Sequence, residues 1–176
     1  FFYQKELYVF LLTIRFSLNM KLLTLKITSE FRNLKNLNLS FDPANDTYVI
    51  IGNNGTGKTN ILEAISSIFS ILLNHSTDFL FSFVLRYEIN DIIYRVKHNK
   101  VTGVTEYYKG DISVNEIDMI YPNRIVCNYS GEDTRMWDNY DKKANEEYLN
   151  SVRSAESPNI LSIVPPISSL ITRAHS

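Results

Sequence analysis

The stretch that decides the fold is Gly52-Asn-Asn-Gly-Thr-Gly-Lys-Thr59. It fits the pattern G-x-x-x-x-G-K-[ST], the Walker A pattern of a phosphate-binding loop, at every fixed position. Such a loop has to follow a strand and open a helix, and the sequence predicts both. The apolar run Thr47-Tyr-Val-Ile-Ile51 indicates a short strand buried on both faces. After it, apolar residues at helical spacing predict a helix from Asn60 to Leu73.

The residue types of this loop suit ATP bound with Mg²⁺. Its three glycines permit left-handed backbone angles, so that successive N–H groups can face one concavity at the positive end of a helix. Lys58 is expected to reach the β- and γ-phosphate oxygens, and Thr59 to give its hydroxyl to the metal. An ordinary glycine turn with a solvated lysine would need neither this spacing nor the Lys-Thr pair. The predicted ATP-binding residues are Gly52, Asn53, Asn54, Gly55, Thr56, Gly57, Lys58, Thr59 and Asn60.

Strand patterns lie on both sides of the loop. Apolar and polar residues alternate over residues 23–28 and 36–41, and a polar connector joins the two runs. Alternation returns over residues 81–89, where Asn90-Asp91 is a plausible hairpin turn before a second run. A short strand at 124–128 precedes a helical pattern between Trp137 and Val152. The fold expected from these patterns is α/β, a P-loop domain with a mixed sheet and an antiparallel β arm.

Composition narrows the class of protein only a little. The 176 residues carry 18 Lys and Arg against 19 Asp and Glu, a net charge of −1, so no global field favours nucleic acid or an anionic membrane. A single cysteine, Cys127, excludes an internal disulfide framework and a cysteine-based zinc site. The apolar run near the N-terminus contains Arg15 and is shorter than the roughly 20 residues of a membrane-spanning helix. We therefore expect no membrane role and a cytoplasmic location.

The chain divides into four segments by composition. Residues 1–19 precede the first methionine, Met20, and are interpreted as upstream or non-native sequence outside the fold. Residues 20–130 are predicted to form the P-loop lobe and residues 131–157 a helical segment. Ser130 at the end of the lobe and Asp133 suggest a helix start at this boundary. Residues 158–176 show neither helical nor strand periodicity and stay unassigned, as a tail or a point of truncation.

Three pieces of sequence resemble the N-terminal lobe of ABC-type ATPases, in the branch of RecF, the SMC proteins and the OLD-like bacterial AAA family ATPases. They are Met20-Lys-Leu-Leu-Thr-Leu-Lys-Ile27, Phe31-Arg-Asn-Leu-Lys35 and the loop with its helix start through Asn60-Ile-Leu-Glu-Ala64. In that branch the basic residue of the Phe-Arg-Asn segment lies near the nucleotide, which makes Arg32 a candidate phosphate or base contact. A solvated charge in a strand connector is the alternative for Arg32.

The resemblance also implies parts that this sequence lacks. Hydrolysis in the family needs an apolar strand ending in Asp-Glu and a signature loop from a second subunit, and neither motif occurs here. The chain therefore resembles the first part of an ATPase, with catalytic residues unknown. A homodimer through the nucleotide site, contact with DNA and a role in anti-phage defence are expectations from the family alone.

Other interpretations share the phosphate loop. A GTPase would carry Asn-Lys-x-Asp, but the sequence after Asn99-Lys100 places Thr102 where aspartate is required. A small-molecule P-loop kinase remains an alternative, although the arginine-rich lid typical of such enzymes is absent. A third alternative is a non-catalytic module that binds ATP as a structural ligand.

Overall fold

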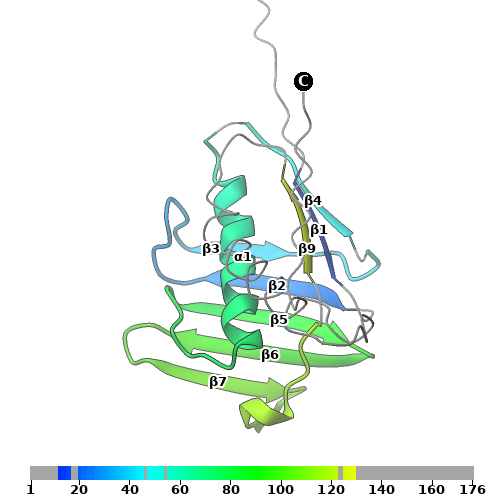
Figure 1. Cartoon of the computed structure of the whole chain (residues 1–176), viewed down its shortest axis with the longest axis vertical. Helices are drawn as coiled ribbons and strands as arrows, with labels where there is room; N and C mark the ends of the chain where they lie inside the picture. Colours follow the sequence, from blue (N-terminus) through cyan, green and yellow to red (C-terminus); the bar gives the residue numbers. More distant parts are fainter. Residues whose placement is uncertain (1–11, 17–19, 46, 54, 123–124, 130–176) are drawn as a thin grey trace, which may run out of the picture.

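Two antiparallel sheets enclose one long helix in the computed structural model, which describes residues 12–16, 20–45, 47–53, 55–122 and 125–129 (Figure 1). The larger sheet has six strands in the order β3-β2-β5-β6-β7-β8, and the smaller has three in the order β4-β1-β9. The elements are β1 (Leu12–Phe16), β2 (Lys21–Ile27), β3 (Leu37–Ser40), β4 (Thr47–Ile50), α1 (Lys58–Leu73), β5 (Phe83–Ile89), β6 (Ile92–Asn99), β7 (Val104–Lys109), β8 (Ile112–Val114), a 3₁₀ turn at Glu116–Asp118 and β9 (Ile125–Tyr129).

The larger sheet forms because its strands alternate between a buried and an open face. Leu25, Leu85, Val96 and Tyr107 are in register across four strands on the buried side. Aromatic rings reinforce this side, where Phe69 of α1 lies 6.0 Å from Tyr87 between ring centroids. The other face carries polar and charged side chains, as the predicted half-buried strands require.

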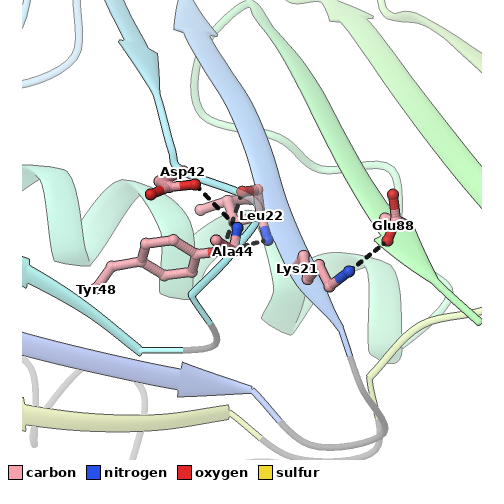
Figure 2. Close-up of polar contacts among 6 residues, drawn as sticks. All are labelled: Lys21, Leu22, Asp42, Ala44, Tyr48 and Glu88. Atoms are coloured by element: carbon pink, nitrogen blue, oxygen red, sulfur yellow. Dashed lines mark hydrogen bonds and ion pairs between the residues drawn. The ribbon is translucent and has the colours of Figure 1, made fainter. Parts of the chain in front are cut away.

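Two local irregularities shape this sheet. Asn90 and Asp91 have φ of +51° and +61° between the paired residues Ile89 and Ile92, which confirms the predicted two-residue hairpin turn. In β2 the register shifts between Leu22 and Thr24, so that Leu22 is fully buried. The hydroxyl of Tyr48 in β4 accepts from the Leu22 amide at 3.1 Å and donates to the Leu22 carbonyl at 3.2 Å (Figure 2). This residue of β4 thereby joins the phosphate-loop strand to the larger sheet.

The helix α1 is buried on almost every side. The sequence predicts one apolar stripe, and the residues of that stripe, Ile61, Ile65, Ile68 and Leu72, are buried. Glu63, Ser66 and Ser67 are buried as well, which a helix with a solvated polar face would not show. The reason is its position: α1 crosses the larger sheet on one side and contacts β1 and β9 of the smaller sheet on another (Figure 1).

The smaller sheet departs from the sequence expectations in three ways. Every pairing among the described strands is antiparallel, so the mixed sheet does not occur there; β4 and β9 run parallel to each other but are separated by β1. Val49 and Ile51 are 48% and 64% exposed, so the strand before the loop is not buried on both faces, because β4 is an edge strand in this part of the chain. Leu12–Phe16, which the sequence analysis set outside the fold, forms the central strand.

Several predictions fall outside the described residues. These are the helix start at Ser130 and Asp133, the helix between Trp137 and Val152 and the unassigned segment 158–176. The predicted strand at 124–128 corresponds to β9. Among the described residues, no helix is long and apolar enough to cross a membrane.

Candidate nucleotide-binding site

The loop between β4 and α1 has the backbone that its glycines predict, with one exception. Gly55 and Gly57 have φ of +81° and +91°, in the left-handed region, whereas Gly52 does not. Gly57 is the N-cap of α1, with no side chain capping the helix and no acidic residue in its first turn. The positive end of a 16-residue helix therefore opens onto the loop without a competing carboxylate of its own first turn. Such an end favours an anion.

Lys58 holds the loop together from inside. Its side chain is buried, and Nζ donates to the carbonyl oxygens of both Gly52 and Asn53 at 2.5 Å. The Asn53 carbonyl also accepts from Thr56 Oγ1 at 2.8 Å. An ammonium group has three donors, so two carbonyl bonds leave one for a ligand. Lys58 thus combines a structural role in the loop with an available charge for a phosphate.

The polar connector between β2 and β3 packs directly on this loop. Phe31 and Leu34 form an isolated antiparallel bridge around Arg32 and Asn33. The Asn33 amide donates to the Gly55 carbonyl at 3.3 Å, and its Oδ1 accepts from Asn60 Nδ2 at 2.6 Å. Asn33 therefore ties the glycine loop to the first turn of the helix. Asn33 is the third member of the Phe-Arg-Asn triplet that carries the resemblance, but it was not among the predicted site residues.

Arg32 forms an ion pair with a buried carboxylate. Its Nη2 lies 2.7 Å from Glu63 Oε1, and the side chains are 44% and 2% exposed respectively. Arg32 adopts φ +55°, which is rare for a residue with a side chain. The second oxygen of Glu63, Oε2, is buried without a hydrogen-bond partner among the described residues. Arg32 is thus fixed next to the loop rather than free in solvent.

The remaining predicted site residues differ in exposure. Asn53, Gly55 and Thr56 are exposed, and Thr59 and Asn60 are half-buried; Asn54 lies outside the described residues. The structure describes two of the three histidines of the sequence: His98 is buried and His75 is exposed. No group of three or more His, Cys, Asp or Glu side chains that could hold a metal occurs in the described part of the chain. Any metal here would therefore depend on phosphate oxygens as well as on the Thr59 hydroxyl.

A strand, a glycine loop with a buried lysine and an open helix N-terminus define a P-loop protein. The chain belongs to the AAA ATPase domain family, whose model matches residues 20–163. This match supports an ATPase over a small-molecule kinase.

Curated relatives are DNA replication and repair proteins RecF. The protein from Rickettsia akari is 32% identical over 102 residues, covering 51% of this chain and 28% of the relative. That from Rickettsia typhi is 34% identical over 100 residues, covering 49% and 27%. The protein from Rickettsia canadensis is 54% identical over 43 residues, covering 24% and 11%. The matched part of the chain thus spans between 11% and 28% of the length of these relatives. No solved structure matches it.

Proposed function

We propose that this chain binds ATP with Mg²⁺ as the N-terminal nucleotide-binding part of an ABC/SMC-like ATPase. The observation that carries the proposal is the buried Lys58 ammonium, placed at the open end of α1 between two loop carbonyls. A triphosphate would meet a positive helix end, backbone N–H groups and this ammonium at one place. Gly55 and Gly57 permit the left-handed backbone angles of the loop that leads into this helix end.

Among the described site residues, Thr59 supplies a hydroxyl that fits the metal ion. Its hydroxyl is half-buried in the first turn of α1, next to the loop. Mg²⁺ prefers oxygen ligands and keeps several waters, so one protein hydroxyl, two phosphate oxygens of the nucleotide and water molecules could together complete its ligands. Bound Mg²⁺ would neutralise charge on the β- and γ-phosphates. Hydrolysis would further need the Walker B and signature motifs, which we expect to come from outside this sequence.

Replacing Lys58 tests nucleotide binding. A ligand that binds only the folded state stabilises it by about 2.7 kcal/mol at a concentration of 100 Kd. ATP with Mg²⁺ is expected to raise the Tm of the 176-residue chain, and Lys58→Ala to abolish the increase. Lys100→Ala, an exposed lysine in the β6–β7 turn, is the matched control and should keep it. An unchanged ATP response in Lys58→Ala would contradict the proposal.

A second pair of variants asks whether Arg32 touches the nucleotide. Arg32→Ala leaves the buried Glu63 carboxylate without its partner, which costs about 1–3 kcal/mol of unfolding free energy. The double variant Arg32→Ala with Glu63→Gln also removes the Glu63 charge, and it is expected to recover much of the lost unfolding free energy. If Arg32 contacts a phosphate, the double variant regains stability but still binds ATP more weakly. Full recovery of ATP affinity would assign Arg32 a structural role only.

Association with DNA is the second part of the proposal. It is supported by the relatives, which are named DNA replication and repair proteins. Binding of DNA by this chain, with and without ATP, is measurable by gel shift or fluorescence anisotropy. A chain that binds ATP but no DNA would keep the first part and remove the second.

A further inference from the structure

The face of the larger sheet that points away from α1 carries an unusual charge pattern. We call it the outer face; it consists of Asn38 and Ser40 (β3), Lys21, Thr24 and Lys26 (β2), Val84, Arg86 and Glu88 (β5), Ile93, Arg95 and Lys97 (β6), Glu106 and Tyr108 (β7) and Ser113 (β8). Five of these side chains are cationic and two are acidic. The chain as a whole is close to neutral, so the positive excess is local.

Both carboxylates of the outer face are already neutralised. Glu88 forms an ion pair with Lys21 (Figure 2), and Glu88 Oε1 lies 3.0 Å from Lys21 Nζ. Glu106 accepts from Lys97 Nζ at 2.9 Å and from the Tyr108 hydroxyl at 3.3 Å. Three cations remain in excess: Lys26, Arg86 and Arg95.

Arg86 and Arg95 are directly opposite each other in the β5–β6 register. Like charges in opposing positions destabilise a sheet, so stability alone does not favour this pair. The Arg95 guanidinium lies 3.9 Å from the centroid of the Tyr108 ring, which orients the group while leaving its N–H edge available. The two arginines therefore place two cations opposite each other in the middle of the face, and Tyr108 orients one of them; we call this pair the cationic centre.

Hydroxyl groups extend this centre across the whole sheet. In register from β3 to β8 the row reads Ser40, Thr24, Arg86, Arg95, Tyr108 and Ser113, with no carboxylate in it. At about 4.8 Å between strands, six strands span about 24 Å. A single phosphate group can contact only a small part of a row of that length, whereas a polymer with a phosphate at every repeat can make contacts along all of it.

We infer that the outer face binds the phosphodiester backbone of DNA. Cations and hydroxyls are the groups that contact backbone phosphates, and such contacts carry no sequence information. Tyr108 is the one aromatic residue of the outer face, and Arg95 occupies one face of its ring, so contacts with phosphates rather than stacking on bases are expected to dominate. The inference gives a surface to the DNA association proposed above. It is independent of nucleotide binding, because the outer face shares no residue with the phosphate loop.

Salt-dependent binding of a short labelled DNA duplex, measured by fluorescence anisotropy on the 176-residue chain without nucleotide, tests this inference. With Lys26, Arg86 and Arg95 as the three phosphate contacts, affinity should fall about 40-fold between about 50 and 200 mM salt. Arg86→Ala and Arg95→Ala should each weaken binding and reduce the slope of log K against log salt by about 1. Arg86→Lys should keep the slope, since it keeps the charge.

The controls separate this face from general electrostatics and from the nucleotide site. Lys100→Ala removes one exposed charge outside the face and should leave the DNA affinity close to that of the unmodified chain. Lys58→Ala should lose the response to ATP but keep DNA binding. Circular dichroism of each variant checks that it is folded.

Three results would overturn the inference. The first is absence of DNA binding at low salt, and the second is equal weakening by Lys100→Ala and Arg86→Ala. The third is a polyglutamate peptide that binds the face as tightly as the duplex, which would assign it to an acidic protein partner.

Discussion

At the scale of single residues, Gly57 shows most directly why the loop has this sequence. Its φ of +91° is a conformation that a side chain strains, and the space beside it is occupied. A Cβ there would lie 2.9 Å from Asn33 Oδ1 and 3.1 Å from Leu34 Cδ2. Backbone angle and close packing of the connector therefore both require glycine at the start of α1.

Gly57→Ala is predicted to destabilise the chain more than Gly103→Ala. Gly103, in the β6–β7 turn, has φ +70° but nothing within 4 Å of an added Cβ, so its variant carries the conformational cost alone, about 1–2 kcal/mol. Gly57→Ala adds displacement of Asn33, which should also weaken ATP binding. Denaturant unfolding and ATP-dependent Tm measure the two effects. Equal unfolding free energies for the two variants would show that the connector yields without cost.

The loop residues were predictable because the motif fixes residue type and order together. The Lys58 contacts were not, since the pattern specifies a charge for the phosphates but not its bonds to the Gly52 and Asn53 carbonyls. Asn33 was missed because a residue 22 positions before Gly55 reaches the loop only after β3 and β4 have folded back. Single-sequence patterns do not report such long-range polar contacts.

At the scale of elements, strand β6 carries a buried histidine. His98 is 4% exposed, packs on Phe79 with 4.7 Å between ring centroids and is 2.9 Å from Thr105 Oγ1 through Nδ1. Burial lowers the pKa of His98 below its ordinary value of 6.5, because desolvation disfavours the protonated ring. Burial therefore favours the neutral form of the His98 ring in the folded chain.

This burial predicts a pH dependence of stability. Below about pH 6.5 the unfolded chain takes up a proton at His98 more readily than the folded chain does. The unfolding free energy therefore decreases as the pH falls from about 6.5 towards the lower pKa of His98 in the folded chain. Each unit by which folding lowers a pKa changes the unfolding free energy by about 1.4 kcal/mol across the full titration. In denaturant unfolding between pH 7.5 and 5.5, a range of about 2 units around the ordinary pKa, His98→Gln should lose part of this slope. A pH dependence of the unfolding free energy that His98→Gln leaves unchanged would refute the assignment.

Elements were predicted well where local pattern and turn chemistry agree, as in the hairpin at Asn90 and Asp91. The burial of an element was predicted less well where it depends on neighbouring elements that are distant in sequence. The run at Thr47–Ile51 is apolar enough for a central strand, yet Val49 is exposed because β4 has one partner in the described sheet. Similarly, α1 is buried at Ser66 and Ser67 as well as along its apolar stripe, and it contacts β1 and β9, which are far from it in sequence.

At the scale of the whole molecule, β1 connects regions that are far apart in sequence. It pairs with β4 through Leu12 to Arg15 and with β9 through Leu12 to Phe16, and it contacts α1. The strand that leads into the phosphate loop has no other strand partner among the described residues. Residues 1–19 were interpreted from the sequence as upstream or non-native. In the structure, Leu12–Phe16 of this segment form the strand that joins β4 to β9.

Deleting residues 1–19 tests what β1 contributes. Strands on either side of a central strand are about 10 Å apart, so β4 and β9 cannot pair without moving together. We therefore predict a lower Tm for the chain that begins at Met20, with loss of hydrogen-exchange protection in β4 and β9 but not in the β5–β6 hairpin, whose pairing does not involve β1. ATP should still raise the Tm of the shortened chain, because Gly57, Lys58 and Asn33 all remain. Unchanged Tm and protection would mean that β4 and β9 close up into a parallel pair, which would support the interpretation of residues 1–19 as dispensable and restore the mixed sheet that the sequence predicts.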